Sequence, residues 1–368
     1  MGNDRLIDAK KARLDEFYTL YEDIEKEVNA YLEFDPDTFR DKTVLLPCDD
    51  PEWSNFTKFF AQNFERLGLR KLISTSRSPD SKEMQLVAQP TLFELESPKY
   101  DSKKSKVKGK IFTLTKDHTG DERIDYKDLE WEYLAEDGDF RSAEVTKLRD
   151  EADIVITNPP FSLLREFIAW VFEAKKQTLI IGNMNAITYK ETFPLIQDNQ
   201  LWIGATNFNV GMYFRVPDDF VYADSYKFTR EINGQKVNRV PSVCWFTNID
   251  HGRRHQPIPL MTWDENVKFS KHKEIRGVGY KKYDDFDAID IPFADAIPSD
   301  YEGIMGIPIS FLNKYSPEQF EIVGNLGSYA PDGYSLASKI YVEGSKIYKR
   351  IAIRHRKKKQ QEYTGRIS

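Results

Sequence analysis

Short apolar runs alternate with stretches of helical periodicity through the first half of the chain. Buried strands are predicted from the apolar runs at residues 42–46, 69–75, 153–157 and 178–182. The helices predicted between them each show one apolar face, formed by Phe56, Phe59, Phe60, Phe64 and Leu67 in the first and by Leu164, Phe167, Ile168 and Val171 in the second. This alternation predicts an α/β fold with a mostly parallel, doubly wound sheet that helices cover on both faces.

The alternation is interrupted between residues 77 and 136. A polar, Lys-rich stretch at residues 99–110 predicts an insertion over about residues 78–130, and residues 111–115 are expected to form a strand of a hairpin. Later in the chain, strands are predicted at residues 211–216 and 243–249, on either side of a polar loop at residues 218–239.

Composition limits the class of protein. The 368 residues suffice for two domains, and 40% hydrophobic residues supply a sizeable core. No apolar run approaches the ~20 residues of a membrane span, and the charged N-terminus contains no apolar signal region. Cys48 and Cys244, with five scattered histidines, form neither a disulfide framework nor a zinc-binding pattern. We therefore expect a cytoplasmic protein that uses no metal and no membrane.

The charge is unevenly distributed along the chain. The net charge is −6, and residues 15–50 hold twelve acidic residues against three basic ones. Residues 226–282 instead hold twelve Lys/Arg against five Asp/Glu, and residues 346–359 hold eight Lys/Arg and no acid. An acidic front half followed by basic segments is typical of a protein that grips a nucleic-acid duplex with one face. A solvated surface is the alternative for each single charge run.

The residues Asn158, Pro159, Pro160 and Phe161 follow the apolar run at residues 153–157 and indicate a specific chemistry. The lone pair of an amino group on an aromatic ring is delocalised, so the nitrogen is a poor nucleophile. Two oxygens that accept its two N–H bonds, from the Asn158 side chain and the Pro159 backbone, would free that lone pair. Proline has no N–H to compete and holds the preceding residue extended. Phe161 offers a flat face on which a base can stack. The motif therefore predicts methyl transfer to a planar amino nitrogen.

Further candidate residues follow other strands of the predicted sheet. Asp49 and Asp50 come after the first strand, where Asp50 also has the sequence of a helix N-cap before Pro51. Thr75 ends the second strand. Ligands bind beyond the carboxyl ends of parallel strands, so we expect these residues to converge with Asn158 on one cleft.

At this point an ordered set of motifs resembles the adenine-N6-specific DNA methyltransferases, and among them the EcoRI modification type. The motifs run through most of the chain: DEFYT at residues 15–19, CDDP at 48–51, SNF at 54–56, GDFRS at 138–142, TNPPFSL at 157–163, ITYKE at 187–191 and SPEQF at 316–320. Residues 99–110 and the basic tail after residue 346 lie outside the pattern.

The resemblance implies a Rossmann-like fold that uses S-adenosylmethionine, and an adenine flipped out of double-stranded DNA. It places Tyr18 and Thr19 at the methionine end of the methyl donor. It places Asp139 on the donor's adenine amine and Phe140 against that ring. Asp49 or Asp50 is expected near the positive charge of the donor.

The turns that follow the first two strands depart from the family pattern. A glycine-rich turn usually follows the first strand, but here Pro47 and Cys48 lead into the acidic pair without a glycine, and both are expected beside the donor. The second strand usually ends in an acid that holds the ribose, and here Ser74, Thr75 and Ser76 stand in its place.

The resemblance also divides the chain into two regions. Residues 1–250 are expected to form the catalytic domain and residues 251–368 a basic DNA-recognition region. Candidate DNA contacts in the second region are Arg253, Arg254, Lys268, Lys271 and Lys273. The protein is expected to act as a monomer, with a cognate restriction endonuclease as a possible partner in the same system.

Other interpretations stay open at the level of sequence. The motif at residues 158–161 suits any planar amide-like nitrogen, including one in RNA or in a protein glutamine. The pair Pro47–Cys48 resembles the nucleophile of cytosine-C5 methyltransferases, although free cysteines are mostly packing residues. A DNA-binding protein that has lost catalysis is a third possibility, against which the intact motif argues.

Overall fold

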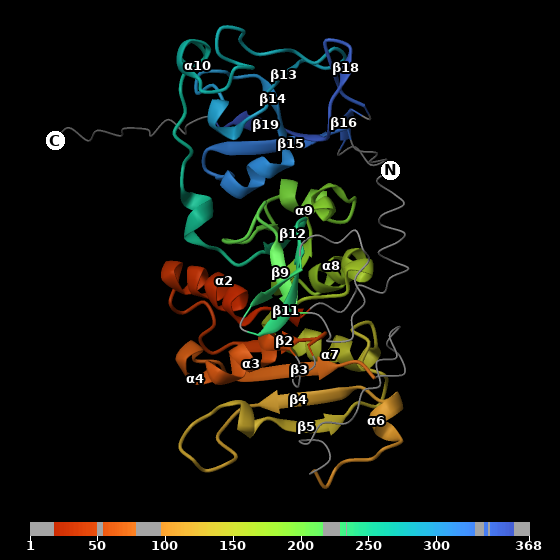
Figure 1. Cartoon of the computed structure of the whole chain (residues 1–368). Coiled ribbons are helices and arrows are strands. Elements are labelled where there is room, and N and C mark those ends of the chain that lie inside the picture. The colour runs from red at the N-terminus through yellow and green to blue at the C-terminus, as the bar shows by residue number, and fades with distance from the viewer. Residues whose placement is uncertain are drawn as a thin grey trace, which may run out of the picture. The chain divides into compact units, whose positions relative to one another are not determined.

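The computed structural model describes residues 18–49, 54–78, 97–215, 229–232, 234–327, 335–337 and 339–356. The chain forms two compact units (Figure 1). The first unit comprises Met1–Thr192 and Gln200–Gly252, and the second comprises Phe193–Asn199 and Arg253–Ser368.

An eight-stranded mixed sheet forms the centre of the first unit. Its strands, in spatial order, are β5 (Glu130–Tyr133), β4 (Lys110–Leu114), β3 (Lys71–Ser76), β2 (Thr43–Leu46), β6 (Ile154–Thr157), β7 (Gln177–Asn183), β12 (Val243–Thr247) and β8 (Trp202–Ile203). The four strands predicted from apolar runs are confirmed as β2, β3, β6 and β7. Every residue of β2, β6 and β12 is buried, as the absence of polar alternation predicts.

The expectation of a mostly parallel sheet is correct only for its centre. The strands β3, β2, β6 and β7 pair in parallel. The pairs β3–β4, β4–β5, β7–β12 and β12–β8 are antiparallel. The insertion adds β4 and β5 at one edge, where β4 is the predicted hairpin strand, and β12 returns antiparallel at the other edge.

Helices cover both faces of this sheet (Figure 1). The helices are α2 (Tyr21–Phe34), α3 (Asn55–Gln62), α4 (Phe64–Leu67), α7 (Ala143–Glu151) and α8 (Leu164–Glu173), with the short α6 (Lys104–Val107) in the insertion. The apolar sides of α2, α3 and α4 share a core with Val44 and Ile154 of the sheet. On β7, Gly182 faces Leu164 of α8. Successive side chains of a strand point to opposite faces of the sheet, so the strands pack against helices on both faces.

The start of α3 differs from the prediction. Its N-cap is Ser54, whose hydroxyl accepts from the backbone N–H of Phe56, rather than Asp50. Asp50 itself lies outside the described residues.

A second, four-stranded sheet belongs to the same unit and is called the small sheet below. Its antiparallel strands are β1 (Tyr18–Thr19), β9 (Met212–Arg215), β11 (Gln235–Val240) and β10 (Thr229–Ile232). The predicted polar loop at residues 218–239 is therefore wrong for its second half, which forms β10 and β11. The Asn233-Gly234 sequence between them is a typical hairpin signal that the prediction did not use.

A buried carboxylate ties α2 to the loop that follows β8. Glu27 is fully buried and accepts from the backbone N–H groups of Ala205 and Thr206, from the Thr206 hydroxyl and from the Tyr31 hydroxyl. Burial raises the pKa of Glu27 above its ordinary value, although these hydrogen bonds act in the opposite direction.

The second unit is built on a five-stranded sheet. In spatial order its strands are β13 (Ala288–Asp290), β14 (Ile304–Pro308), β19 (Arg350–His355), β15 (Phe320–Leu326) and β16 (Ser335–Ala337). A hairpin of β17 (Tyr341–Val342) and β18 (Ser345–Lys346), the helices α9 (Phe193–Gln197) and α10 (Trp263–Phe269), and short 3-10 helices complete it. The basic tail is therefore partly structural, since Ile351, Ala352 and Ile353 of β19 are buried; residues 357–359 lie outside the described part.

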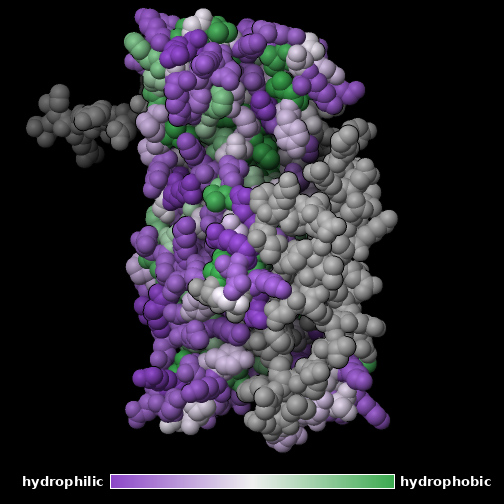
Figure 2. Space-filling model, in the orientation of Figure 1, coloured by the Kyte–Doolittle hydropathy of each residue, from purple (hydrophilic) through white to green (hydrophobic). Residues whose placement is uncertain are grey.

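The described surface is predominantly polar. On the face drawn in Figure 2 most coloured residues are hydrophilic. None of the helices in the described ranges combines the length and the apolar character needed to cross a membrane.

We expect Glu27→Ala to lower the free energy of unfolding by about 3 kcal/mol or more, because four buried donors lose their acceptor. Urea denaturation measures the loss, and Glu25→Ala, at an exposed position of the same helix, is the control. The raised folded-state pKa means that the stabilising contribution of Glu27 falls as the pH rises above its ordinary value of 4.5. The gap between protein and variant should therefore be wider at pH 5 than at pH 8. Equal stability of both variants would contradict this role.

Candidate active site

The turn at residues 158–161, called the NPPF turn below, lies between a central strand and a helix. It follows β6, which pairs in parallel with β2 on one side and β7 on the other. Pro159 is buried, and Asn158 and Phe161 are half-buried. A 3-10 helix (Phe161–Leu163) follows and leads into α8. The turn therefore lies at the carboxyl end of the parallel strands, where α/β sheets bind ligands.

The ring of Phe161 is positioned by the small sheet. Its centroid lies 6.4 Å from that of Phe214 in β9, with the two rings nearly perpendicular at 84°. This edge-to-face geometry is favourable for aromatic pairs. Thr19 of β1 is paired with Phe214, and its backbone oxygen accepts from the Asn55 side chain at 2.7 Å. Tyr18 and Thr19 are thus brought to the region of the NPPF turn.

A buried carboxylate joins the turn after β2 to the NPPF turn. Asp49 is 5% exposed, and its two carboxylate oxygens accept from the hydroxyls of Ser54, at 2.7 Å, and Thr157, at 2.5 Å. Thr157 is the last residue of β6 and immediately precedes Asn158. Both oxygens of Asp49 are therefore engaged in positioning the site, and its predicted place near a positive charge of the donor stays a prediction.

Hydroxyls from the end of β3 bind the same turn. Ser74 donates to the backbone oxygen of Asp49, and its hydroxyl lies 2.9 Å from that of Thr57 in α3. Thr75 is fully buried and donates to the backbone oxygen of Pro47 at 3.0 Å. The ends of β2, β3 and β6 are thus brought together as the sequence led us to expect. A contact of Thr75 with a ribose stays a prediction.

The thiol of Cys48 is a poor candidate nucleophile. The residue is half-buried, and burial together with the neighbouring Asp49 carboxylate raises the pKa of its thiol far above the ordinary value. Catalytic cysteines instead need a lowered pKa, because the thiolate is the reactive form. This argues against the cytosine-type interpretation of Pro47–Cys48.

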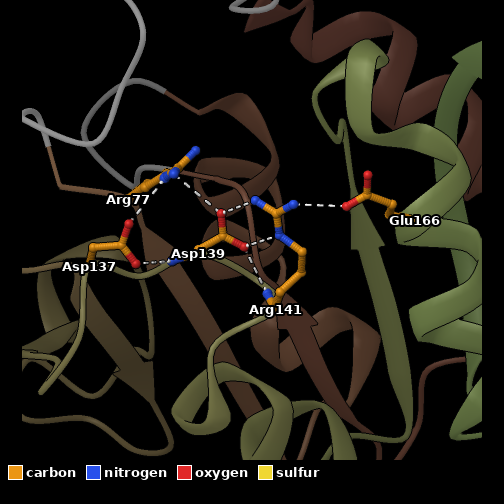
Figure 3. A network of polar contacts seen from close by, with 5 residues as sticks. All are labelled: Arg77, Asp137, Asp139, Arg141 and Glu166. Carbon is orange, nitrogen blue, oxygen red and sulfur yellow. Dashed lines mark hydrogen bonds and ion pairs between the residues drawn. The ribbon is translucent and has the colours of Figure 1, made fainter.

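Asp139 lies in a network of charged side chains that Figure 3 shows in full. Its carboxylate accepts two hydrogen bonds from the Arg141 guanidinium, each 2.8 Å long, and lies 3.3 Å from a terminal nitrogen of Arg77. Arg141 also pairs with Glu166 of α8 at 2.8 Å, and Arg77 with Asp137 at 3.4 Å. The hydrogen bonds from Arg141 lower the pKa of Asp139, which is therefore ionised at neutral pH.

A glycine fixes the position of this network. Gly138 has a φ of +80°, and a side chain there would collide with the backbone oxygen of Ser76 at the end of β3. Asp139 thus lies beside the carboxyl end of β3. The carboxylate oxygens of Asp139 are already paired with Arg77 and Arg141, so an adenine amine of the donor would have to share them as acceptors. The contact of Asp139 with that amine stays a prediction.

Phe140 points into the core rather than toward solvent. It is 3% exposed, and its ring packs edge-on against Phe167 and Trp170 of α8, at centroid distances of 5.0 and 5.4 Å. The guanidinium of Arg141 lies 5.4 Å from the ring centroid on another side. Stacking of this ring on a ligand stays a prediction.

The five basic residues assigned to DNA all belong to the second unit. Lys268 and Lys273 are exposed and form no ion pair within the described ranges, whereas Lys271 pairs with Asp295 at 2.6 Å. Arg254 is only 6% exposed and donates to Asn199 at 2.6 Å. Arg253 is half-buried. Among these five residues, the side chains with solvent-exposed positive charge are therefore the lysines.

Several supporting residues were missed at the level of sequence. Ser54 and Thr157 hold Asp49, and Arg77, Arg141 and Glu166 surround Asp139. Thr157 and Arg141 lie within the motifs quoted above, but the sequence did not indicate which residues they contact. Among residues within the described ranges, no group of three or more His, Cys, Asp or Glu side chains gathers as a metal site.

Comparison with known proteins is consistent with this geometry. Residues 5–367 match the family described as "Adenine-specific methyltransferase EcoRI". The type II methyltransferase M.EcoRI of Escherichia coli is 38% identical over 87% of this chain and 89% of its own length. M.MpnI of Mycoplasma pneumoniae is 34% identical over 95% of this chain and 97% of its own. M.MgeORF184P of Mycoplasma genitalium is 34% identical over 87% and 86%, respectively.

No solved structure matches the chain. The family match spans nearly all of the sequence, and it includes the NPPF turn and the turn after β2. The chain therefore belongs to the adenine-specific methyltransferase family of EcoRI type.

Proposed function

We propose that this protein transfers a methyl group from S-adenosylmethionine to the N6 amino group of an adenine flipped out of double-stranded DNA, at a specific site. The observation that carries the proposal is the position of the NPPF turn at the carboxyl end of β6, next to the hydrogen bond that the Thr157 hydroxyl donates to the Asp49 carboxylate. Membership of an adenine-specific family and similarity to type II methyltransferases support the same reaction. RNA or a protein glutamine as substrate is not favoured by these relatives.

The residues present fit the methyl donor in one testable respect. The Thr19 hydroxyl is buried and makes no hydrogen bond within the described part of the chain. Such a group requires a polar partner, and the methionine end of the donor supplies one. We place Tyr18 and Thr19 at that end, the turn of Pro47, Cys48 and Asp49 beside the donor, and Thr75, Asp139 and Phe140 toward its nucleoside. S-adenosylmethionine, when bound, supplies an electrophilic methyl group.

The chain's own groups activate the nucleophile. The Asn158 side-chain oxygen and the Pro159 backbone oxygen accept the two N–H bonds of the adenine amine, and Phe161 stacks on the base. With the donor bound, the freed lone pair would attack the methyl carbon in line; the C–S bond would break as the N–C bond forms, and its electron pair would stay on the sulfur of the neutral thioether product. The product nitrogen carries one extra proton, which leaves to water, so no side chain has to act as a base. Positioning and electrostatics therefore provide most of the rate.

Extrusion of the base follows from the position of the turn. A paired and stacked adenine cannot bring its amino group to a half-buried Asn158, so the nucleotide must leave the duplex. We propose that the first unit is a Rossmann-like methyltransferase domain and that the second unit recognises DNA, with the exposed Lys268 and Lys273 on phosphates. We further propose a monomer that protects the sites of a cognate restriction endonuclease, in keeping with the type II designation of the relatives.

Asn158→Ala should abolish methyl transfer, because one of the two oxygens that activate the amine is lost. Since the side chain is half-buried and fills little core volume, the thermal midpoint should change little. Transfer of labelled methyl groups to genomic DNA measures activity, and single-molecule sequencing identifies the modified adenines. Wild-type turnover in this variant would contradict the assigned role.

Thr157→Val should lower kcat by about tenfold or more, because the Asp49 carboxylate then loses its hydrogen bond from Thr157 and no longer restrains the NPPF turn. Thr157→Ser keeps the hydroxyl and is the matched control, so it should retain most of the activity. Steady-state kinetics with both substrates separates kcat from KM. If the valine and serine variants behave alike, the hydroxyl has no positioning role.

Affinity for DNA should fall steeply as salt is added, because bound lysines release counterions from the duplex. The double variant Lys268→Ala, Lys273→Ala should reduce the slope of log K against log salt by about two. The control is Lys26→Ala with Lys147→Ala, two exposed positions of the first unit. A slope unchanged in the first pair would exclude these lysines as phosphate contacts.

A further inference from the structure

Asn238, within β11 of the small sheet, carries a buried amide for which no described residue is a hydrogen-bond partner. The residue is 1% exposed, and neither its Oδ1 nor its Nδ2 has a partner in the described part of the chain. Of the buried polar side chains described, it alone leaves both ends of its polar group unpaired. Burial of an unpaired amide is unfavourable, and buried polar groups are normally bonded. No described residue satisfies this amide, so it is available to pair with a polar group of a ligand.

The strand register places this amide close to the NPPF turn. Asn238 of β11 is paired with Phe214 of β9, and Thr19 of β1 is paired with the same Phe214 from the other side. Directly paired residues project from the same face of a sheet, so the three side chains form one row. Phe214 and Phe161 share the core cluster, and their rings meet edge to face. Figure 1 shows β9 and β11 side by side.

The position of Phe214 distinguishes two possible ligands. Thr19, assigned above to the methyl donor, and Asn238 lie on opposite sides of Phe214, and two strand spacings separate their backbones by roughly 10 Å. Phe214 contacts Phe161, the residue assigned to stacking of the base. Because Thr19 is assigned to the methionine end of the donor, we assign the opposite side of the row, where Asn238 lies, to the base.

The chemistry of the amide matches one edge of adenine. A side-chain amide offers a donor and an acceptor next to each other, and asparagine pairs in this way with the amino group and the adjacent ring nitrogen of adenine. Adenine has such a ring nitrogen on both sides of its amino group, at N1 and at N7. Three-centre hydrogen bonds are common in proteins, so Asn238 Oδ1 can share an amino N–H with the NPPF turn.

We propose that Asn238 binds the extruded adenine, with Nδ2 donating to N1 or N7 and Oδ1 accepting from the amino group. Asn238 then discriminates adenine from guanine, which carries an oxygen in place of the amino group. This inference rests on the function proposed above and adds a specificity-determining residue to it.

A substitution that removes the unpaired amide tests the first part. Asn238→Leu should raise the thermal midpoint of the free protein by a few degrees, because an apolar side chain of similar size replaces a buried amide that no described residue satisfies. The same variant should lose methyl transfer. The opposing changes separate a ligand-binding role from a structural one, since loss of a structural hydrogen bond lowers both. A lower thermal midpoint for Asn238→Leu would overturn the inference.

Modified bases test the second part. Asn238→Ala should lower kcat/KM for the target duplex by roughly 10- to 100-fold, the range expected for loss of a bidentate contact to a base, while the KM for S-adenosylmethionine stays unchanged. Duplexes with 1-deazaadenine or 7-deazaadenine at the target position remove one ring acceptor each. One of them should impair the wild-type protein and have no further effect on Asn238→Ala. The control Asn29→Leu makes the same exchange at a half-buried position of α2 in the first unit and should leave these values unchanged.

Other results contradict the inference in distinguishable ways. A raised KM for S-adenosylmethionine with normal DNA kinetics would assign the amide to the methyl donor. Equal response of wild type and Asn238→Ala to both deaza bases would exclude the contact with a ring nitrogen. Normal activity of the Asn238 variants beside an inactive Asn158→Ala would remove this inference and leave the proposed function standing.

Discussion

The geometry of the candidate active site depends on the hydrogen bonds of one buried carboxylate, that of Asp49. Asp49 follows β2. Its carboxylate accepts one hydrogen bond from Ser54, at the start of α3, and another from Thr157, at the end of β6. A charge with so little exposure is tolerated only when donors satisfy both oxygens, and two hydroxyls do so here. Because Thr157 adjoins Asn158, the orientation of the NPPF turn is set by a residue more than a hundred positions away in the sequence.

The central fold was predictable because its signals are local. The apolar runs that became β2, β3, β6 and β7 contain no polar alternation, and burial on both faces leaves that mark on any sequence. The strands at the edges of the sheets were harder to predict. β8 is two residues long, and β10 and β11 are polar enough to read as a loop, although Asn233-Gly234 marks their hairpin.

The candidate site was predicted in its residue types but not in its pairings. Asn158 and Asp49 follow neighbouring parallel strands and Thr75 lies at the end of a third, so parallel topology alone brings them together. The partners of Asp139 could not be read in the same way, because Arg77 and Glu166 come from distant elements. Asn238, whose amide no described residue satisfies, could not be singled out from the sequence, since only the pairing of β9 with β11 places it beside Phe214.

The position of β19 has a consequence for how the protein is made. This strand, Arg350–His355, lies in the middle of its sheet, between β14 and β15, although it is the last strand in the described part of the chain. All strands of the eight-stranded sheet have been synthesised once β12 has left the ribosome, whereas the sheet of the second unit stays split until β19 has been translated. A premature stop codon before residue 350 would thus yield a polypeptide that contains the NPPF turn but lacks the strand on which the sheet of the second unit closes.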